Sequence, residues 1–138
     1  MRYFFYGTLM DADVRAMVLS PASRDRPMEA ALLYGYRRVF MAERVYPVVA
    51  PSPASSVAGA LSGDLNAEDA VRLAAFESDE YDEVTRNVVA DDGETVSARV
   101  FVAGPKAVQS STVWDLEIWQ RRHKRAFLRR TRLRGWEH

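Results

Sequence analysis

The N-terminal part of the chain alternates short apolar blocks with polar breaks, a pattern typical of strands and helices joined by turns. Tyr3–Tyr6 is apolar at every position and predicts a strand that is buried on both faces. The strand ends at a glycine. Asp11–Leu19 then predicts a short helix with Asp11 or Asp13 as its N-cap, because aspartate side chains accept hydrogen bonds from free backbone N–H groups.

A longer apolar segment follows the polar loop Ser20–Pro27. Glu29–Phe40 predicts a long strand, and Gly35 inside it predicts a bulge or bend. Three prolines then interrupt the apolar pattern, and proline cannot donate a hydrogen bond to a neighbouring strand. We therefore expect a loop that Ser55-Ser56 closes, marked by Pro47, Pro51 and Pro53.

The middle of the chain predicts another strand and the second helix. Val57–Leu65 has strand character. Asn66 is a suitable N-cap for a helix over Ala67–Phe76, in which Leu73 and Phe76 share one apolar face.

A hairpin follows the second helix. Ser78–Asp82 reads as an acidic turn, and Val84–Ala90 and Thr95–Val102 both have strand character. Asp91-Asp92-Gly93 between these two strands is a hairpin signal, because aspartate and glycine suit tight turns.

The last segment, Thr112–Arg132, predicts one long helix in which Trp119, His123 and Phe127 recur every four residues.

The order of strands and helices lacks strict alternation, which argues against a doubly wound parallel sheet. A length of 138 residues suits one domain. The sequence therefore predicts a single α+β domain over residues 1–138, with a small mixed or antiparallel β-barrel and flanking helices.

Charge and cysteine content narrow the function classes. Nineteen basic and nineteen acidic residues cancel, which argues against general adhesion to nucleic acid or membranes. The arginine-rich tail Gln120–Arg134 leaves open a surface for an acidic partner. The chain has no cysteine, which excludes disulfides and thiolate chemistry, and no apolar run is long enough to span a bilayer. We expect a cytoplasmic protein that is a monomer or weak homodimer.

The turn Tyr6-Gly7-Thr8-Leu9 is the first candidate for chemistry. Glycine lets a ligand approach the backbone closely, and successive amide N–H groups pointing one way bind anions. Such a turn suits a carboxylate or a developing oxyanion. The alternative is an ordinary connection between a strand and a helix.

Glu77 is the second candidate. It ends an apolar helical face directly after Phe76, and apolar surroundings raise the pKa of a carboxyl group because they disfavour its charged form. A carboxyl with a raised pKa can act as a general base and acid near neutral pH. The alternative is a solvated residue in an acidic turn with Asp79, Glu80 and Asp82.

Other common kinds of site lack support in the sequence. Two histidines, His123 and His138, without cysteine argue against a structural zinc site. The nucleophile elbow Gly-x-Ser-x-Gly and glycine-rich nucleotide-binding loops are both missing. We expect no metal and no cofactor.

Taken in order, several segments resemble the gamma-glutamylcyclotransferase-like family, in its avirulence-induced branch. The resemblance covers most of the chain and depends on the order and spacing of its parts more than on any one of them. The matching segments are Tyr3–Leu9, Tyr46–Val49, Val57–Gly59, Leu73–Glu77 with Tyr81 after it, and Trp119–Phe127.

This resemblance implies a cofactor-free reaction in which a γ-glutamyl amine cyclises and releases 5-oxoproline. It implies that Glu77 is the general base and acid. It also implies that Gly7, Thr8 and Leu9 bind the substrate through their amides, while Tyr6 and Tyr81 close the pocket and orient Glu77.

The chain departs from the family pattern at three positions. Ala74 stands where the family usually has aspartate, Glu83 where it often has arginine, and Phe101 where it usually has tyrosine. These departures favour the alternative of a non-catalytic module that binds a small ligand on the same fold.

Overall fold

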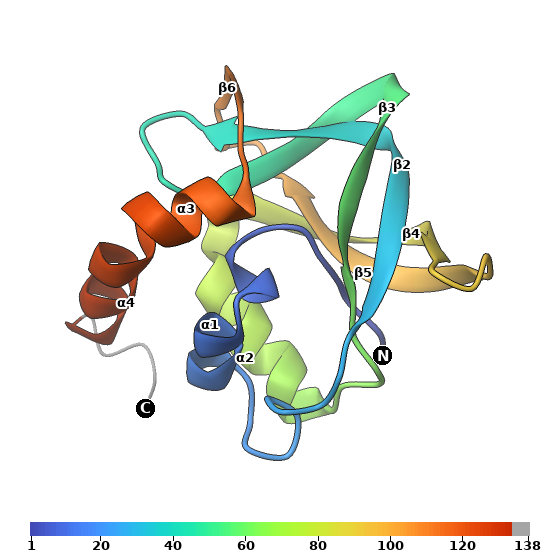
Figure 1. Ribbon diagram of the computed structural model, residues 1–138, viewed down its shortest axis with the longest axis horizontal. Helices are drawn as coiled ribbons and strands as arrows, with labels where there is room; N and C mark the ends of the chain where they lie inside the picture. Colours follow the sequence, from blue (N-terminus) through green and yellow to red (C-terminus); the bar gives the residue numbers. More distant parts are fainter. Residues whose placement is uncertain (134–138) are drawn as a thin grey trace.

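A six-stranded antiparallel sheet dominates the computed structural model, which describes residues 1–133 (Figure 1). Five strands follow the order β1-β3-β2-β4-β5, and β6 pairs with β2. Their bounds are β1 Phe4–Phe5, β2 Glu29–Met41, β3 Pro47–Leu61, β4 Tyr81–Ala90, β5 Thr95–Ala103 and β6 Gln109–Val113. One parallel bridge between Tyr3 and Arg99 links the two ends of the strand order. The predicted α+β class is confirmed, whereas closure of the sheet into a barrel stays a prediction.

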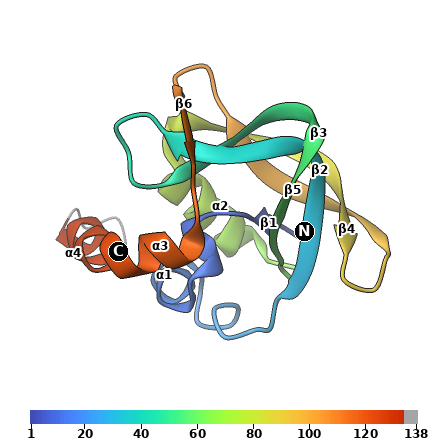
Figure 2. The same ribbon diagram turned by 45° about the horizontal axis from the view of Figure 1, so that its top comes forward.

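The helices lie to one side of the sheet in both ribbon views (Figures 1 and 2). They are the 3-10 turns η1 (Thr8–Met10) and η2 (Ser78–Glu80) and the α-helices α1 (Ala12–Val18), α2 (Ala67–Glu77), α3 (Leu116–Arg122) and α4 (Lys124–Leu133). No helix within residues 1–133 is both long and apolar enough to cross a membrane.

The predicted N-caps of the first two α-helices are confirmed. Asp11 Oδ1 accepts hydrogen bonds from the backbone N–H groups of Asp13, at 2.9 Å, and Val14, at 3.2 Å. Asn66 Oδ1 accepts one from the N–H of Asp69 at 2.9 Å. Both caps satisfy donors that have no partner inside the helix, which fixes where each helix begins.

The predicted bulge at Gly35 is also confirmed, but the loop predicted at the three prolines is wrong. Gly35 has a φ of 85°, and the register jumps from Tyr34–Ser56 to Tyr36–Pro51. Residues 52–55 of β3 therefore face one residue of β2. The prolines fit inside β3 because Pro47 starts it and the other two lie at or within this irregular stretch, where ladder hydrogen bonds are interrupted.

The C-terminal segment is not the single helix that was predicted. Its start is the strand β6, which pairs with β2 through Val39–Val113. Asp115 Oδ1 then accepts a hydrogen bond from the N–H of Ile118 at 3.0 Å and starts α3. The chain leaves helical geometry at His123, with a φ of −123°, before α4 begins. Arg134 and His138 lie outside the described residues.

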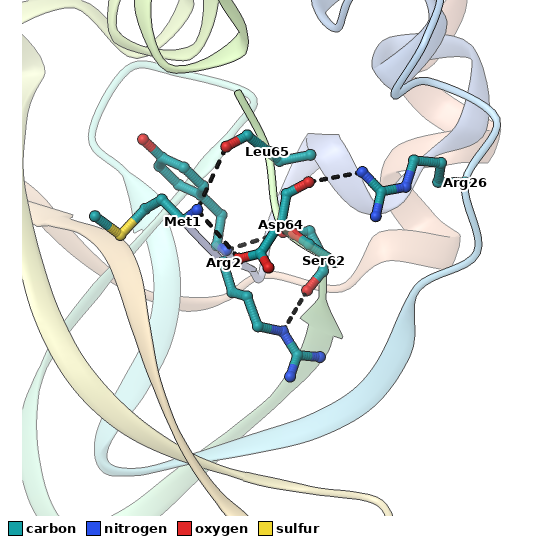
Figure 3. A network of polar contacts seen from close by, with 8 residues as sticks. Met1, Arg2, Arg26, Ser62, Asp64 and Leu65 are labelled. Carbon is teal, nitrogen blue, oxygen red and sulfur yellow. Dashed lines mark hydrogen bonds and ion pairs between the residues drawn. The ribbon is translucent and has the colours of Figure 1, made fainter. Parts of the chain in front are cut away.

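The start of the chain is fastened to the segment that follows β3 (Figure 3). The ammonium of Met1 pairs with Asp64 Oδ1 at 3.2 Å, and Arg2 Nε donates to the carbonyl of Ser62 at 2.9 Å. Arg26 Nη1 donates to the carbonyl of Asp64 at 2.6 Å from the other side. These contacts fix the course of β1, and with it the turn at its end.

β1 crosses β3 with almost no space between them at Gly59. A Cβ atom at this position would lie 2.4 Å from the carbonyl oxygen of Phe5 and 2.6 Å from Cζ of Phe4. Phe4 and Phe5 are both buried, so neither strand has room to move away. Glycine at position 59 is therefore a condition for this placement of β1.

We predict that Gly59→Ala lowers the free energy of unfolding by about 1–3 kcal/mol, the usual cost of forcing an extra group into a packed interior. Urea unfolding with a spectroscopic readout measures this loss. Ala58→Ser is the matched control, because it adds one atom to the exposed neighbouring residue of β3. Equal losses in the two variants would contradict the proposed clash.

Candidate functional site

A cavity of about 270 Å³ opens where the turn after β1, the end of α2 and the C-terminal helix α4 come together. The sheet contributes a fourth side through the starts of β3 and β4 and through β5. The lining residues are Phe4–Leu9, Tyr46, Pro47, Ala75–Ser78, Glu80, Tyr81, Phe101, Phe127 and Thr131. All six residues predicted as a site from the sequence therefore line one cavity.

The turn Gly7-Thr8-Leu9 forms one wall of this cavity. Gly7 precedes η1, and a Cβ atom there would lie 2.8 Å from Cγ of Pro47, so the two residues are in close contact. The first hydrogen bond of η1 runs from the N–H of Met10 to the carbonyl of Gly7 at 3.0 Å. Among residues 1–133, none of the hydrogen bonds is donated by the backbone N–H of Gly7, Thr8 or Leu9. These donors are thus available to a bound group.

Two arginines hold this turn from outside the cavity. Arg38 Nη1 donates to the carbonyl of Tyr6 at 2.9 Å, just before the turn. Arg15 Nη1 donates to the carbonyls of Leu9, at 3.1 Å, and Met10, at 2.8 Å, just after it. The carbonyls on both sides are therefore engaged by fixed cations. Neither arginine was predicted as part of the site: Arg15 is the one basic residue of its helix, whereas Arg38 follows Arg37 in β2.

Glu77, the last residue of α2, lies on a different wall. It is partly buried, and its carboxyl has no hydrogen bond or ion pair with any residue of the described part of the chain. Burial raises the pKa of Glu77 to about 8, and the negative charge of Glu80 adds to this rise. The carboxyl is therefore mostly protonated at neutral pH and can still lose its proton slightly above it.

Tyr6 and Tyr81 complete the surroundings of Glu77. The Tyr6 hydroxyl donates to the carbonyl of Phe101 at 2.5 Å, and the Tyr81 hydroxyl donates to the carbonyl of Pro47 at 2.7 Å. Burial and the nearby charge of Glu77 keep the pKa of both tyrosines well above the ordinary value, so both stay neutral. Both tyrosines line the cavity. Within the described residues neither hydroxyl hydrogen-bonds to Glu77, so their roles in closing the pocket and orienting Glu77 stay predictions.

A second carboxyl in the cavity wall is firmly held. Glu80 Oε1 accepts a hydrogen bond from the Tyr46 hydroxyl at 2.6 Å, and Glu80 Oε2 pairs with Arg44 Nε at 3.2 Å. Burial, together with this bond to Glu80, raises the pKa of Tyr46 to about 12. From the sequence, Glu80 was expected in an acidic turn, and Tyr46 entered only through the resemblance. Their pairing needs contact between the loop before β3 and η2, which no local pattern reveals.

Two of the three departures from the family pattern fall outside the cavity. Ala74 is exposed on α2, and Glu83 pairs with Arg99 at 2.7 Å. Neither lines the cavity, whereas Phe101 does. Within residues 1–133, no group of three or more His, Asp or Glu side chains is arranged to hold a metal ion.

Comparison with known proteins agrees with this arrangement. Residues 3–121 match the family described as gamma-glutamyl cyclotransferase, AIG2-like. The chain belongs to this family. It is 30% identical to AIG2-like protein A from Arabidopsis thaliana over 127 residues, which are 91% of this chain and 75% of that relative. It is 28% identical to AIG2-like protein D from the same plant over 132 residues, with 94% and 85% covered.

Solved structures of other proteins share this fold. A solution structure of an Arabidopsis thaliana protein superimposes with a TM-score of 0.66 at 28% identity, covering 94% of this chain and 87% of the other. A structure named gamma-glutamyl cyclotransferase gives a TM-score of 0.62 at 15% identity, with 78% and 69% covered. The second likeness concerns the fold alone. The resemblance inferred from the sequence is thereby confirmed at the level of family and fold.

We predict that Glu77→Gln makes the protein more stable than the wild type at pH 8, and that the two converge toward pH 4.5. The native pKa of about 8 exceeds the ordinary value of 4.5, so the native state holds a proton that the unfolded state releases. Stability of the wild type therefore falls as pH rises between these values. The gain is a few kcal/mol at most, since one pKa unit is worth about 1.4 kcal/mol.

Thermal or urea unfolding at pH 4.5, 6 and 8 measures this difference. Glu68→Gln on the exposed face of α2 is the matched control, and it should leave the pH dependence of stability unchanged. A Glu77→Gln variant whose stability tracks that of the wild type at all three pH values would show that Glu77 titrates normally.

Proposed function

We propose that the cavity converts a γ-glutamyl amine into 5-oxoproline and the free amine. The observation that carries this proposal is Glu77, which lines the cavity, has a pKa of about 8 and has no hydrogen-bond or ion-pair partner among residues 1–133. Gly7, Thr8 and Leu9, whose amides donate no hydrogen bond within the same residues, line this cavity too. A proton acceptor and a set of fixed N–H donors are what an intramolecular acyl transfer needs.

The reaction joins two ends of one molecule. The α-nitrogen of the γ-glutamyl group forms a bond to the γ-carbonyl carbon, and the bond from this carbon to the amine nitrogen breaks. A five-membered lactam forms. The attacking α-ammonium loses two protons in turn and the departing nitrogen gains two, so the amine leaves as an ammonium. Nucleophile and electrophile belong to the same substrate, so the main task of the protein is to hold them in a folded, reactive geometry.

In this proposal Glu77 moves the proton. Its carboxylate form takes a proton from the α-ammonium, which frees the nitrogen to attack, and later returns it to the departing amine. A pKa of about 8 suits both steps, because donor and acceptor forms coexist near neutral pH. An engaged carboxyl such as that of Glu80, which is held by Tyr46 and Arg44, lacks this freedom.

The amides of the turn stabilise negative charge. They hold either the α-carboxylate of the substrate or the oxyanion that develops on the γ-carbonyl oxygen, and fixed donors are effective because they need no reorganisation. Arg15 and Arg38 support this role by engaging the carbonyls on both sides of the turn.

A non-catalytic binding module on the same fold is the alternative. In the sequence, this alternative was favoured by three departures from the family pattern, at Ala74, Glu83 and Phe101. The first two lie outside the cavity, so only Phe101 alters the wall that a substrate would contact. Catalysis is therefore the better-supported reading of this cavity.

We predict that Glu77→Gln lowers kcat/KM for release of 5-oxoproline from a γ-glutamyl amine by about 10²–10⁴-fold, the usual contribution of a general base. The wild-type kcat/KM should rise with pH and level off above a pKa of about 8, because the base form is the active one. Chromatographic measurement of 5-oxoproline between pH 6 and 9 tests both statements.

Glu68→Gln again serves as the matched control and should retain full activity. Equal turnover by the Glu77→Gln variant would remove Glu77 from the mechanism. Binding of γ-glutamyl amines without any 5-oxoproline release by the wild type would instead favour the binding module.

A further inference from the structure

The C-terminal helix α4 completes the cavity with two side chains. Phe127 and Thr131 both line it, and their spacing of four residues places them on one face of the helix. The Thr131 hydroxyl donates to the carbonyl of Phe127 at 2.8 Å, which leaves its methyl group and oxygen lone pairs available to the cavity. The family match ends at residue 121, so both positions lie beyond it.

Ionic and polar contacts fix the start of α4 against the body of the domain. Lys124 Nζ pairs with Asp11 Oδ2 at 2.9 Å and with Asp13 Oδ2 at 2.8 Å. Gln120 Nε2, on α3, donates to the same Asp11 oxygen at 2.8 Å. Asp11 directly follows η1, so these contacts tie α4 to the segment that carries the amide turn.

Aromatic packing holds the ring of Phe127 at the cavity. It makes edge-to-face contacts with Trp119, at 5.4 Å between ring centroids, Phe76, at 6.2 Å, and Tyr46, at 6.5 Å. Trp119 is fully buried, and Phe76 and Tyr46 line the cavity themselves. The position of Phe127 is therefore set by the core and not by a flexible surface.

The polar groups that suit the glutamyl half of a substrate come from other walls, namely the amide turn and Glu77. The rings of Tyr46, Phe76 and Phe127, with Thr131 beside them, remain to surround the other half. No Lys, Arg or His side chain is among the described residues that line the cavity. An amine substituent in this part of the cavity therefore meets aromatic surface, one threonine and the carboxyl of Glu80, which Tyr46 and Arg44 engage.

We propose that α4 is the element that selects the leaving amine, with Phe127 and Thr131 in contact with its substituent. This inference rests on the proposed function, because it assigns the glutamyl half to the amide turn and Glu77. Phe127 favours a flat apolar substituent through ring contacts. Thr131 is the polar side chain that α4 adds to this part of the wall, and none of the described lining residues is a Lys, Arg or His that could pair with a carboxylate there.

Three probe compounds test the inference on the full chain: L-γ-glutamyl-methylamide, L-γ-glutamyl-phenethylamide and L-γ-glutamyl-L-phenylalanine. The first two differ by an aromatic group, and the last two differ only by a carboxylate on the amine side. A substitution on α4 could also disturb Glu77, but such an effect would change kcat/KM equally for both compounds of a pair. The ratio of the two kcat/KM values is therefore unaffected by it.

Phe127→Ala should lower the preference for phenethylamide over methylamide by roughly tenfold, as expected for a lost ring contact. Thr131→Lys should raise the kcat/KM for L-γ-glutamyl-L-phenylalanine relative to that for L-γ-glutamyl-phenethylamide by about tenfold, because the new ammonium can pair with the carboxylate. Thr112→Lys is the matched control: it adds the same charge at an exposed position of β6 and should change neither ratio.

The inference is overturned if both ratios stay within twofold of the wild-type values in variants whose circular dichroism spectra show an intact fold. Thr131→Lys decides alone if Phe127→Ala does not fold. The proposed function fails separately, through an absence of 5-oxoproline release by the wild type. In that case calorimetry measures the dissociation constant of each probe, and the ratios of these constants replace the ratios of kcat/KM. A lack of binding by every probe overturns both proposals.

Discussion

The buried carboxylate of Asp11 joins more parts of this domain than any other side chain described above. It caps α1, and it accepts from Gln120 on α3 and Lys124 on α4. Burial alone would raise the pKa of Asp11, but the hydrogen bonds from Lys124, Gln120 and the N–H of Val14 outweigh it and leave this pKa lowered. The charged carboxylate can therefore hold the C-terminal helices against the segment that follows the amide turn.

Asp11 and Glu77 show how one fold gives two acids opposite properties. Asp11 is surrounded by donors and stays ionised, whereas Glu77 has none among the described residues and keeps its proton until about pH 8. A partner lowers the cost of burying charge, and its absence makes the neutral form the stable one. The carboxyl of Asp11 is engaged by several donors and holds the structure together, whereas the unengaged carboxyl of Glu77 borders the cavity.

Local patterns in the sequence predicted the parts of the fold that depend on neighbouring residues. Helix caps at Asp11 and Asn66, the hairpin and the bulge at Gly35 all follow from short stretches of chain. The predicted loop at the prolines and the single C-terminal helix were wrong, because β3 and β6 depend on pairing with other strands: β3 with β1 and β2, and β6 with β2. In the same way, Glu77 and the amide turn were predicted, but tertiary contact alone brings in Arg15, Arg38, Glu80, Phe127 and Thr131.

The unequal pairing around Gly35 also gives the domain a means of varying its cavity during evolution. Residues 52–55 of β3 face a single residue of β2, and regular ladders continue on both sides. An insertion or deletion in this short stretch leaves the pairing of either ladder intact but alters how sharply the two strands curl. Pro47, which packs on Gly7, starts the ladder beyond this stretch, so a change in its length would move one wall of the cavity without replacing an acid or an amide there.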